Sequence, residues 1–170
     1  MAEKDKVFST KLKYTGIWDF KQVYRFVYDW LSDNGYTLKE TNYSEKIKPD
    51  GKEIELKWEA KRKISDYFQF LIKADWLILG MTETEVQKEG VKMKMNKGYL
   101  EIKFSAILVK DYEHRWENTA LIKFLRGVYD RYIIKGRIDG YKDKLMAEID
   151  ELIAQTKAFL AIEGKQPPRD

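Results

Sequence analysis

The feature that most constrains the fold is an alternation of apolar and charged or polar residues over positions 52–64 and 67–79. Successive side chains of a β-strand point to opposite faces of its sheet, so this alternation predicts two strands with one apolar face each. The apolar positions are Ile54, Leu56, Trp58, Ala60 and Ile64, followed by Phe68, Phe70, Ile72, Ala74, Trp76 and Ile78. Because the charged face must meet water, one layer of helices on the apolar face is sufficient to complete the fold.

Further strands are expected at 7–14, 36–48, 81–87, 91–95 and 99–112. Gly80 is expected to end or bend the strand before it. The chain is expected to reverse at three tight turns, Pro49-Asp50-Gly51, Ser65-Asp66 and Asn96-Lys97-Gly98.

Helices are predicted at 17–31, 119–134 and 138–160, where apolar residues recur every three or four positions. Gly136 and Gly140 are expected to kink the chain or to separate the last two helices. The helix at 119–134 is expected to turn inward Leu121, Leu125, Val128, Tyr129 and Tyr132. The last helix has an apolar stripe that includes Leu145, Ile149, Leu152, Thr156 and Leu160.

These patterns predict an α+β fold, a curved antiparallel β-sheet packed on one face by an N-terminal helix and long C-terminal helices. We expect one domain over residues 1–164 and a frayed tail at 165–170. The chain has no cysteine, which excludes disulfides, thiolate metal ligands and a cysteine nucleophile. It has neither a signal-peptide pattern nor an apolar run of the roughly 20 residues that span a bilayer, so a soluble, cytoplasmic protein is expected.

Charge and motifs argue against the commonest enzyme classes and against a dedicated nucleic-acid binder. The 32 basic residues are interleaved with 28 acidic ones, whereas a dedicated nucleic-acid binder concentrates its charge. The lone histidine, His114, has no orienting partner or nucleophile in the sequence. No glycine-rich phosphate loop, zinc-ligand spacing or nucleophile elbow occurs. We therefore expect no catalytic residue, no metal site and no cofactor.

One short motif, by contrast, suggests an enzyme. Glu53, Glu55 and Lys57 form a Glu-x-Glu-x-Lys string that resembles the strand signature of the triphosphate tunnel enzymes. The resemblance implies a metal-dependent triphosphate hydrolase, in which alternate strand residues face an enclosed channel. The same channel would then be lined by Lys61, Lys63, Glu83, Glu85, Lys92, Lys94, Glu101 and Lys103. The alternative is a solvated sheet face, since any exposed strand rich in Glu and Lys produces this string.

The order of elements is similar to the helix-grip fold of the START and Bet v 1-like (SRPBCC) proteins. That resemblance implies a curved sheet wrapped around the last helix and a cavity for a lipid or another hydrophobic ligand between them. The matching positions would be Trp58, Phe68, Phe70, Trp76, Phe104, Leu145, Ile149, Leu152 and Thr156. The function expected from it is non-catalytic binding of a hydrophobic or amphipathic small molecule.

A protein or ribonucleoprotein partner is the alternative from a different class. The predicted helix at 17–31 is dense in aromatic residues, most of which suit a core face. Trp18, Phe26 and Tyr28, together with the basic surface, are the candidates for contact with a protein, RNA or membrane surface.

Overall fold

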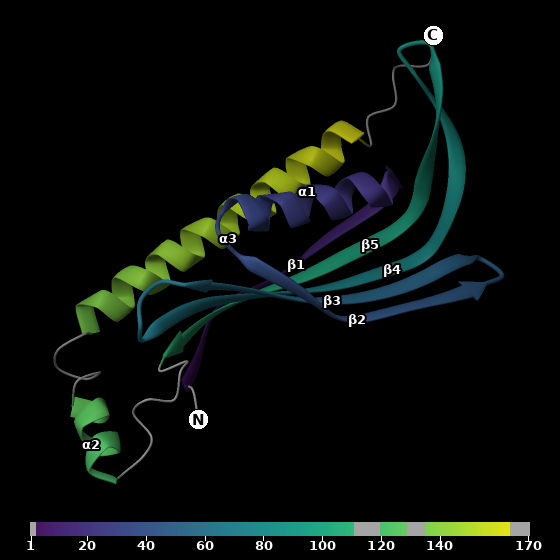
Figure 1. The fold of residues 1–170 in the computed structure, drawn as a ribbon. Coiled ribbons are helices and arrows are strands. Elements are labelled where there is room, and N and C mark those ends of the chain that lie inside the picture. The colour runs from purple at the N-terminus through teal and green to yellow at the C-terminus, as the bar shows by residue number, and fades with distance from the viewer. Residues whose placement is uncertain (1–2, 111–119, 129–134, 164–170) are drawn as a thin grey trace.

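The chain forms one antiparallel sheet with two helices packed on the same face (Figure 1). The computed structural model describes residues 3–110, 120–128 and 135–163. The strands β1 (Glu3–Trp18), β2 (Thr37–Lys48), β3 (Gly51–Lys63), β4 (Phe68–Lys88) and β5 (Val91–Lys110) lie in the order β1-β5-β4-β3-β2. The helices are α1 (Phe20–Asp33), α2 (Ala120–Val128) and α3 (Lys135–Glu163). The predicted α+β class and antiparallel sheet are confirmed.

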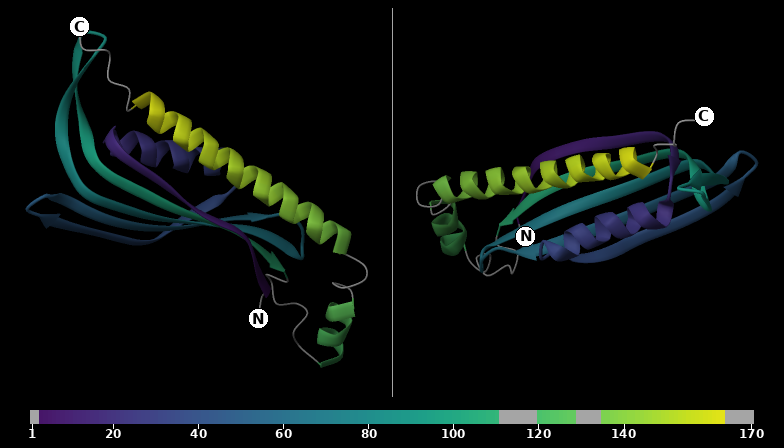
Figure 2. Two further views of the ribbon diagram at one scale, coloured as in Figure 1. Left: turned by 180° about the vertical axis from the view of Figure 1, so that it is seen from behind. Right: turned by 90° about the horizontal axis from the view of Figure 1, so that it is seen from above.

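The predicted sidedness of the sheet is confirmed in β3. In β3, Leu56 and Trp58 are buried whereas Glu55 and Lys57 are exposed. The helix α3 contacts β1 and β5, α1 contacts β2, and the two helices contact each other (Figure 2). The apolar face of the sheet is therefore covered by α1 and α3 side by side. The opposite face is exposed at Glu55 and Lys57 of β3, but on β4 and β5 it carries a second, buried apolar cluster of Leu71, Ile107 and Val109.

A row of glycines explains why the sheet is sharply bent. Gly16 of β1 pairs with Gly98 of β5, and Gly98 lies opposite the register shift in β4 that contains Gly80. Gly80 has a φ of 62°, and Gly51 at the start of β3 has a φ of 132°. A Cβ atom on Gly51 would lie 2.6 Å from the carbonyl carbon of Gly80, so the two backbones approach too closely for a side chain. At this row β4 and β5 turn toward the helices (Figure 1).

The glycine row bears on two sequence predictions. Gly80 was expected to end or bend its strand, and it bends it: β4 continues through Gly80 as a bulge into residues 81–87, which were expected to form a separate strand. The expected turn at Asn96-Lys97-Gly98 is wrong, because these residues pair with β1 and β4 inside the continuous strand β5. By contrast, the predicted turns at residues 49–51 and 65–66 do connect β2 to β3 and β3 to β4.

The ends of the helices differ from the prediction in two ways that matter for function. The strand β1 extends to Trp18, so Trp18 belongs to the sheet rather than to the first helix. α2 and α3 are separate helices, and Gly136 and Gly140 lie within α3. The expected inward packing of Leu121, Leu125 and Val128 is wrong, because all three are exposed. Tyr129, Tyr132 and the predicted tail at 165–170 lie outside the described residues.

Candidate functional site

The two flanks of α1 have different surroundings. On one flank Phe26 stacks on Phe159 of α3, with ring centroids 4.6 Å apart and an interplanar angle of 11°. On the other flank Phe20, Tyr24 and Tyr28 recur every four residues and so form a line along the helix. This second flank contacts β2 and β3, because Tyr24 bonds to Glu40 and both Tyr24 and Tyr28 contact the ring of Trp58. Figure 2 shows α1 beside α3 over this part of the sheet.

An aromatic ladder joins this flank to the sheet. The rings of Tyr24 and Tyr28 meet the Trp58 ring edge to face, at centroid distances of 4.8 Å and 6.3 Å. Trp58 in turn lies 5.1 Å from Trp76 on the neighbouring strand. Aromatic pairs in these geometries add about 0.5–1.5 kcal/mol each beyond the area that they bury. The ladder therefore fixes the position of the exposed flank of α1 over the sheet.

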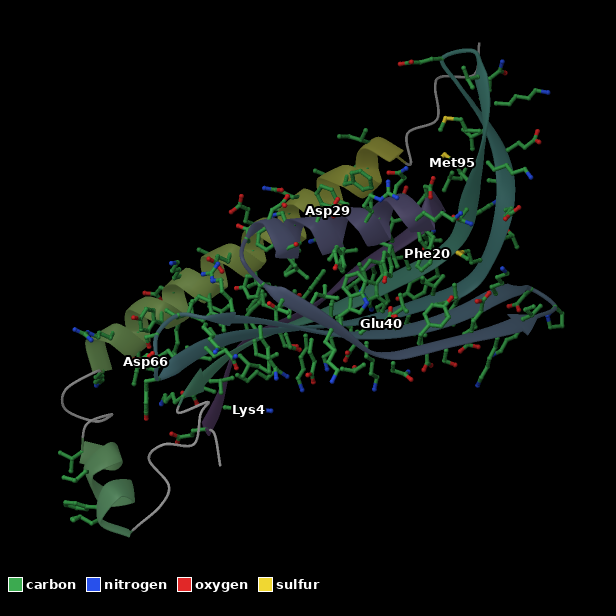
Figure 3. The ribbon with its side chains drawn as sticks, in the orientation of Figure 1. Lys4, Phe20, Asp29, Glu40, Asp66 and Met95 are labelled. Carbon is green, nitrogen blue, oxygen red and sulfur yellow. The ribbon has the colours of Figure 1, made fainter. Side chains whose placement is uncertain are left out.

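Glu40 of β2 anchors the polar ends of this ladder. Its carboxylate accepts a hydrogen bond from Trp58 Nε1 at 3.2 Å and from the Tyr24 hydroxyl at 3.4 Å. Glu40 pairs with Trp58 in the register, so both side chains point to the helix side of the sheet. Burial, and then the negative charge of Glu40, raise the pKa of Tyr24, which therefore stays a neutral donor. In Figure 3, Phe20 and Glu40 lie between α1 and the sheet.

Above the ladder the surface is hollowed into an apolar groove of about 500 Å³. We call it the α1 groove; it is lined by Phe20, Lys21, Tyr24, Arg25, Tyr28 and Asp29. The three aromatic rings form its apolar wall, and Tyr28 is 42% exposed. The three charged residues lie on the solvent side of α1 and give the groove a polar rim.

A second hollow of about 450 Å³ adjoins the first, because Phe20 and Lys21 line both. It lies where the bent strands β4 and β5 approach the N-terminus of α1, and we call it the charged hollow. Its lining is apolar at Phe20, Ile54, Met81 and Met95 and polar at Asp19, Lys21, Tyr43, Glu45, Lys52, Glu83, Lys94 and Asn96. The two hollows thus lie next to each other at the start of α1, one mainly aromatic and the other charged.

The charges in the charged hollow are only partly paired. Glu45 contacts Lys52 at 3.2 Å and accepts a hydrogen bond from the Tyr43 hydroxyl at 3.0 Å. The hydroxyl of Tyr43, and then Lys52, lower the pKa of Glu45, so this carboxyl is ionised at neutral pH. Among the described residues, no ion pair involves Lys21 or Lys94. These two ammonium groups are therefore available to a ligand.

Two hydrogen-bonding groups position the N-terminus of α1, which lines both hollows. Asp19 caps the helix by accepting from the backbone N–H of Lys21 at 3.0 Å and of Gln22 at 3.3 Å. Asn96 of β5 accepts from the backbone N–H of Phe20 at 3.0 Å. The bent strand is thus bonded directly to the helix that forms the groove.

We expect Asp19→Ala to lower the free energy of unfolding by about 1 kcal/mol, because two backbone N–H groups lose their acceptor. Asp33→Ala is the matched control, since Asp33 is an exposed aspartate in the last turn of the same helix. A negative charge there opposes the helix dipole, so its removal should change stability by less than about 0.5 kcal/mol. Urea denaturation followed by circular dichroism measures both changes. Equal losses in the two variants would contradict the capping role.

The nine residues expected to line a cavity between the sheet and the last helix are brought together. All of them are buried, and all except Thr156 belong to one hydrophobic cluster. The Thr156 hydroxyl donates to the backbone oxygen of Leu152 at 2.7 Å, so it is satisfied within α3. None of the nine lines the α1 groove, the charged hollow or a third hollow near Gly35. These nine residues are thus part of the buried core, whereas the three hollows described above lie beside α1 and at the edge of the sheet.

The tunnel hypothesis receives no support from the geometry. Glu55 and Lys57 are exposed on the face away from the helices, and Glu53 pairs with Lys48. The other expected tunnel residues are dispersed: Glu83 and Lys94 line the charged hollow, whereas Lys61 and Lys63 line the third hollow of about 430 Å³. Within the described ranges, no group of three acidic or histidine side chains is arranged to hold a metal ion. His114 lies outside these ranges.

The expected partner surface is corrected for two of its three residues. Trp18 is fully buried at the end of β1, and its Nε1 donates to the backbone oxygen of Gly98 at 3.4 Å. Phe26 is half-buried and stacks against α3. Only Tyr28 is exposed, and it lines the α1 groove. Sequence reasoning missed this groove because Phe20, Tyr24 and Tyr28 have the spacing of an ordinary core flank.

Comparison with known proteins finds no match to this chain. No family model, curated protein or solved structure matches it. No helix in the part of the chain that the structure describes is long and apolar enough to cross a membrane.

Proposed function

We propose that this chain is a non-catalytic, helix-grip-like module that binds an amphipathic small molecule. The observation that carries the proposal is the α1 groove, an open aromatic depression beside a hollow with two unpaired ammonium groups. Small-molecule sites are usually concave and mostly apolar, with a few polar groups that fix the orientation of the ligand. The two neighbouring hollows together have this composition.

The arrangement of the two hollows suggests how such a molecule is oriented. An acyl chain or fused ring system would lie along Phe20, Tyr24 and Tyr28, where apolar surface is exposed to water in the free protein. A polar head would then lie in the charged hollow. Lys21 and Lys94 favour a negative group there, while Glu83 tolerates a positive one at the same head.

This proposal places the ligand beside α1 rather than between the sheet and α3. The nine residues expected to surround it from the sequence are packed against one another and against the helices. Close packing is the ordinary state of a protein interior, and a ligand there would have to displace it. The α1 groove needs no such rearrangement. The outer sheet face, with ion pairs such as Lys11–Glu101 and Lys73–Glu59, presents both charge signs and does not favour a polyanionic partner.

The test is direct binding of a pyrene-labelled fatty acid, followed by fluorescence, together with native mass spectrometry after gentle purification. Tyr28→Asp should weaken binding by at least about tenfold, because it places a charge in the apolar wall of the groove. Leu79→Asp is the matched control, since Leu79 is a similarly exposed apolar side chain on the opposite face of the sheet. It should bind as the unmodified chain does.

Two results would contradict the proposal. One is the absence of saturable binding of any acyl or ring-containing probe. The other is an equal loss of binding in Tyr28→Asp and Leu79→Asp, which would mean that the probe reports general exposure of apolar surface.

A further inference from the structure

The helix α2 carries an apolar stripe that the described structure leaves uncovered. Leu121 and Phe124 are each 67% exposed, Leu125 is 49% exposed and Val128 is 36% exposed. Their spacing of three, four and seven residues puts all four on one side of the helix. Figures 1 and 2 show α2 beyond the N-terminal end of α3, apart from the sheet. A contiguous group of large apolar side chains on one exposed face marks an interaction surface.

The same part of the chain holds the whole excess of positive charge. Residues 120–137 contain five basic residues, Lys123, Arg126, Arg131, Lys135 and Arg137, and one acidic residue, Asp130. The full chain has 32 basic and 28 acidic residues, so the remainder has 27 of each and no net charge. The net charge of +4 and the uncovered apolar stripe therefore coincide in one segment of 18 residues.

The combination of an apolar stripe with positive charge distinguishes between possible binding partners of α2. A nucleic acid would match the charge, but it offers no apolar layer for four aliphatic and aromatic side chains. A second copy of the segment would match the apolar stripe, but it would bring two groups of like charge together. An anionic lipid bilayer matches both, because it has a negative surface above an apolar interior.

We propose that α2 lies in the surface of an anionic lipid bilayer. Leu121, Phe124, Leu125 and Val128 enter the boundary between head groups and acyl chains. The exposed residues Lys135 and Arg137, at the start of α3, remain at the level of the phosphates. The body of the domain, which is electrically neutral, stays in water. This attachment is independent of the ligand proposed for the α1 groove, and either could exist without the other.

Vesicle flotation of the full chain tests this attachment. With phosphatidylcholine vesicles that contain phosphatidylglycerol, the protein should float with the lipid. With phosphatidylcholine alone, the bound fraction should fall by about tenfold or more, and added salt should weaken the anionic binding. The double variant Leu121→Ser/Phe124→Ser should lower binding to anionic vesicles by at least about tenfold, because it removes two of the four apolar contacts.

Two control variants show whether location matters. Ile47→Ser/Val91→Ser removes two apolar side chains of comparable exposure, 84% and 60%, from β2 and β5, and it should not change binding. Lys135→Ser/Arg137→Ser should weaken anionic binding, whereas Lys39→Ser/Lys57→Ser, two exposed lysines of the neutral remainder, should have less effect. Circular dichroism should show all four variants folded, since every replaced side chain is exposed.

Several outcomes would overturn the proposal. These are equal binding to neutral and anionic vesicles, no binding to either, and an equal loss in the stripe variant and its control. A concentration-dependent dimer that Leu121→Ser/Phe124→Ser abolishes, without vesicle binding, would assign the stripe to a second copy of the chain instead.

Discussion

Gly51→Ala is expected to destabilise the fold by about 3 kcal/mol or more, which is a large share of the stability of a domain of this size. Two causes act together. The residue has a φ of 132°, which a residue with a side chain adopts only under strain. The new Cβ would lie 2.6 Å from the carbonyl carbon of Gly80 and 2.9 Å from the backbone oxygens of Gly80 and Met81. Because all these atoms belong to the backbone, the strands would have to separate. Urea denaturation followed by tryptophan fluorescence measures the loss.

Two other glycines separate these causes. Gly90 has a φ of 79° but nothing within 4 Å of an added Cβ, so Gly90→Ala carries the backbone strain alone and should cost about 1 kcal/mol. Gly140 lies inside α3 with the same open surroundings, and Gly140→Ala should stabilise the protein by up to about 1 kcal/mol. If Gly51→Ala is no more costly than Gly90→Ala, the close approach of strands at the bend is not a constraint on the fold.

Glu148→Ala is expected to cost about 2–3 kcal/mol, because it leaves a partly buried guanidinium without its carboxylate. Glu148 of α3 contacts Arg62 of β3 at 2.7 Å and accepts a hydrogen bond from the Tyr36 hydroxyl at 2.7 Å. The side chains of Arg62 and Glu148 are only 18% and 17% exposed. Burial, and then the bond to Glu148, raise the pKa of Tyr36 far above its usual value, so the Tyr36 hydroxyl stays protonated and remains a donor at neutral pH. The measurement is again the urea midpoint.

A double-mutant cycle isolates this interaction from general loss of packing. Arg62→Ala, Glu148→Ala and the combined variant should give a coupling energy of about 1 kcal/mol or more. Lys73 and Glu59 form the matched surface pair, with their charged atoms 4.0 Å apart and the side chains 39% and 35% exposed. Their coupling should be below about 0.5 kcal/mol. Coupling energies that do not differ between the two cycles would show that Arg62 and Glu148 do not join the helix to the sheet.

The sidedness of the sheet could be predicted from the sequence because it is a local property. Alternation in β3 and β4 places Trp58 and Trp76 on one face whatever the rest of the chain does. The same reasoning left Gly80 open between the end of a strand and a bend, and it failed at Gly98, where it predicted a turn. A glycine can end a strand or permit a bend, and only the approach of a neighbouring backbone distinguishes the two roles.

The candidate site was harder to predict than the fold. The α1 groove depends on which flank of α1 meets α3, and nothing in the spacing of Phe20, Tyr24 and Phe26 decides that. Trp18 is a candidate contact residue only if the helix begins at residue 17, whereas β1 extends through it. The charged hollow combines residues from α1, β2, β3, β4 and β5 that only the bent sheet brings together.

The central claim is that an amphipathic ligand binds beside α1, and nuclear magnetic resonance tests it most directly. A titration with a short-chain fatty acid should shift the backbone amide signals of Phe20, Tyr24 and Tyr28 and of strand residues around Met95. The amides of Ile149 and Leu152, at the centre of the interface between α3 and the sheet, should stay in place. Saturable shifts at Ile149 and Leu152 with none at Tyr24 and Tyr28 would contradict the account and would place the ligand between the sheet and α3.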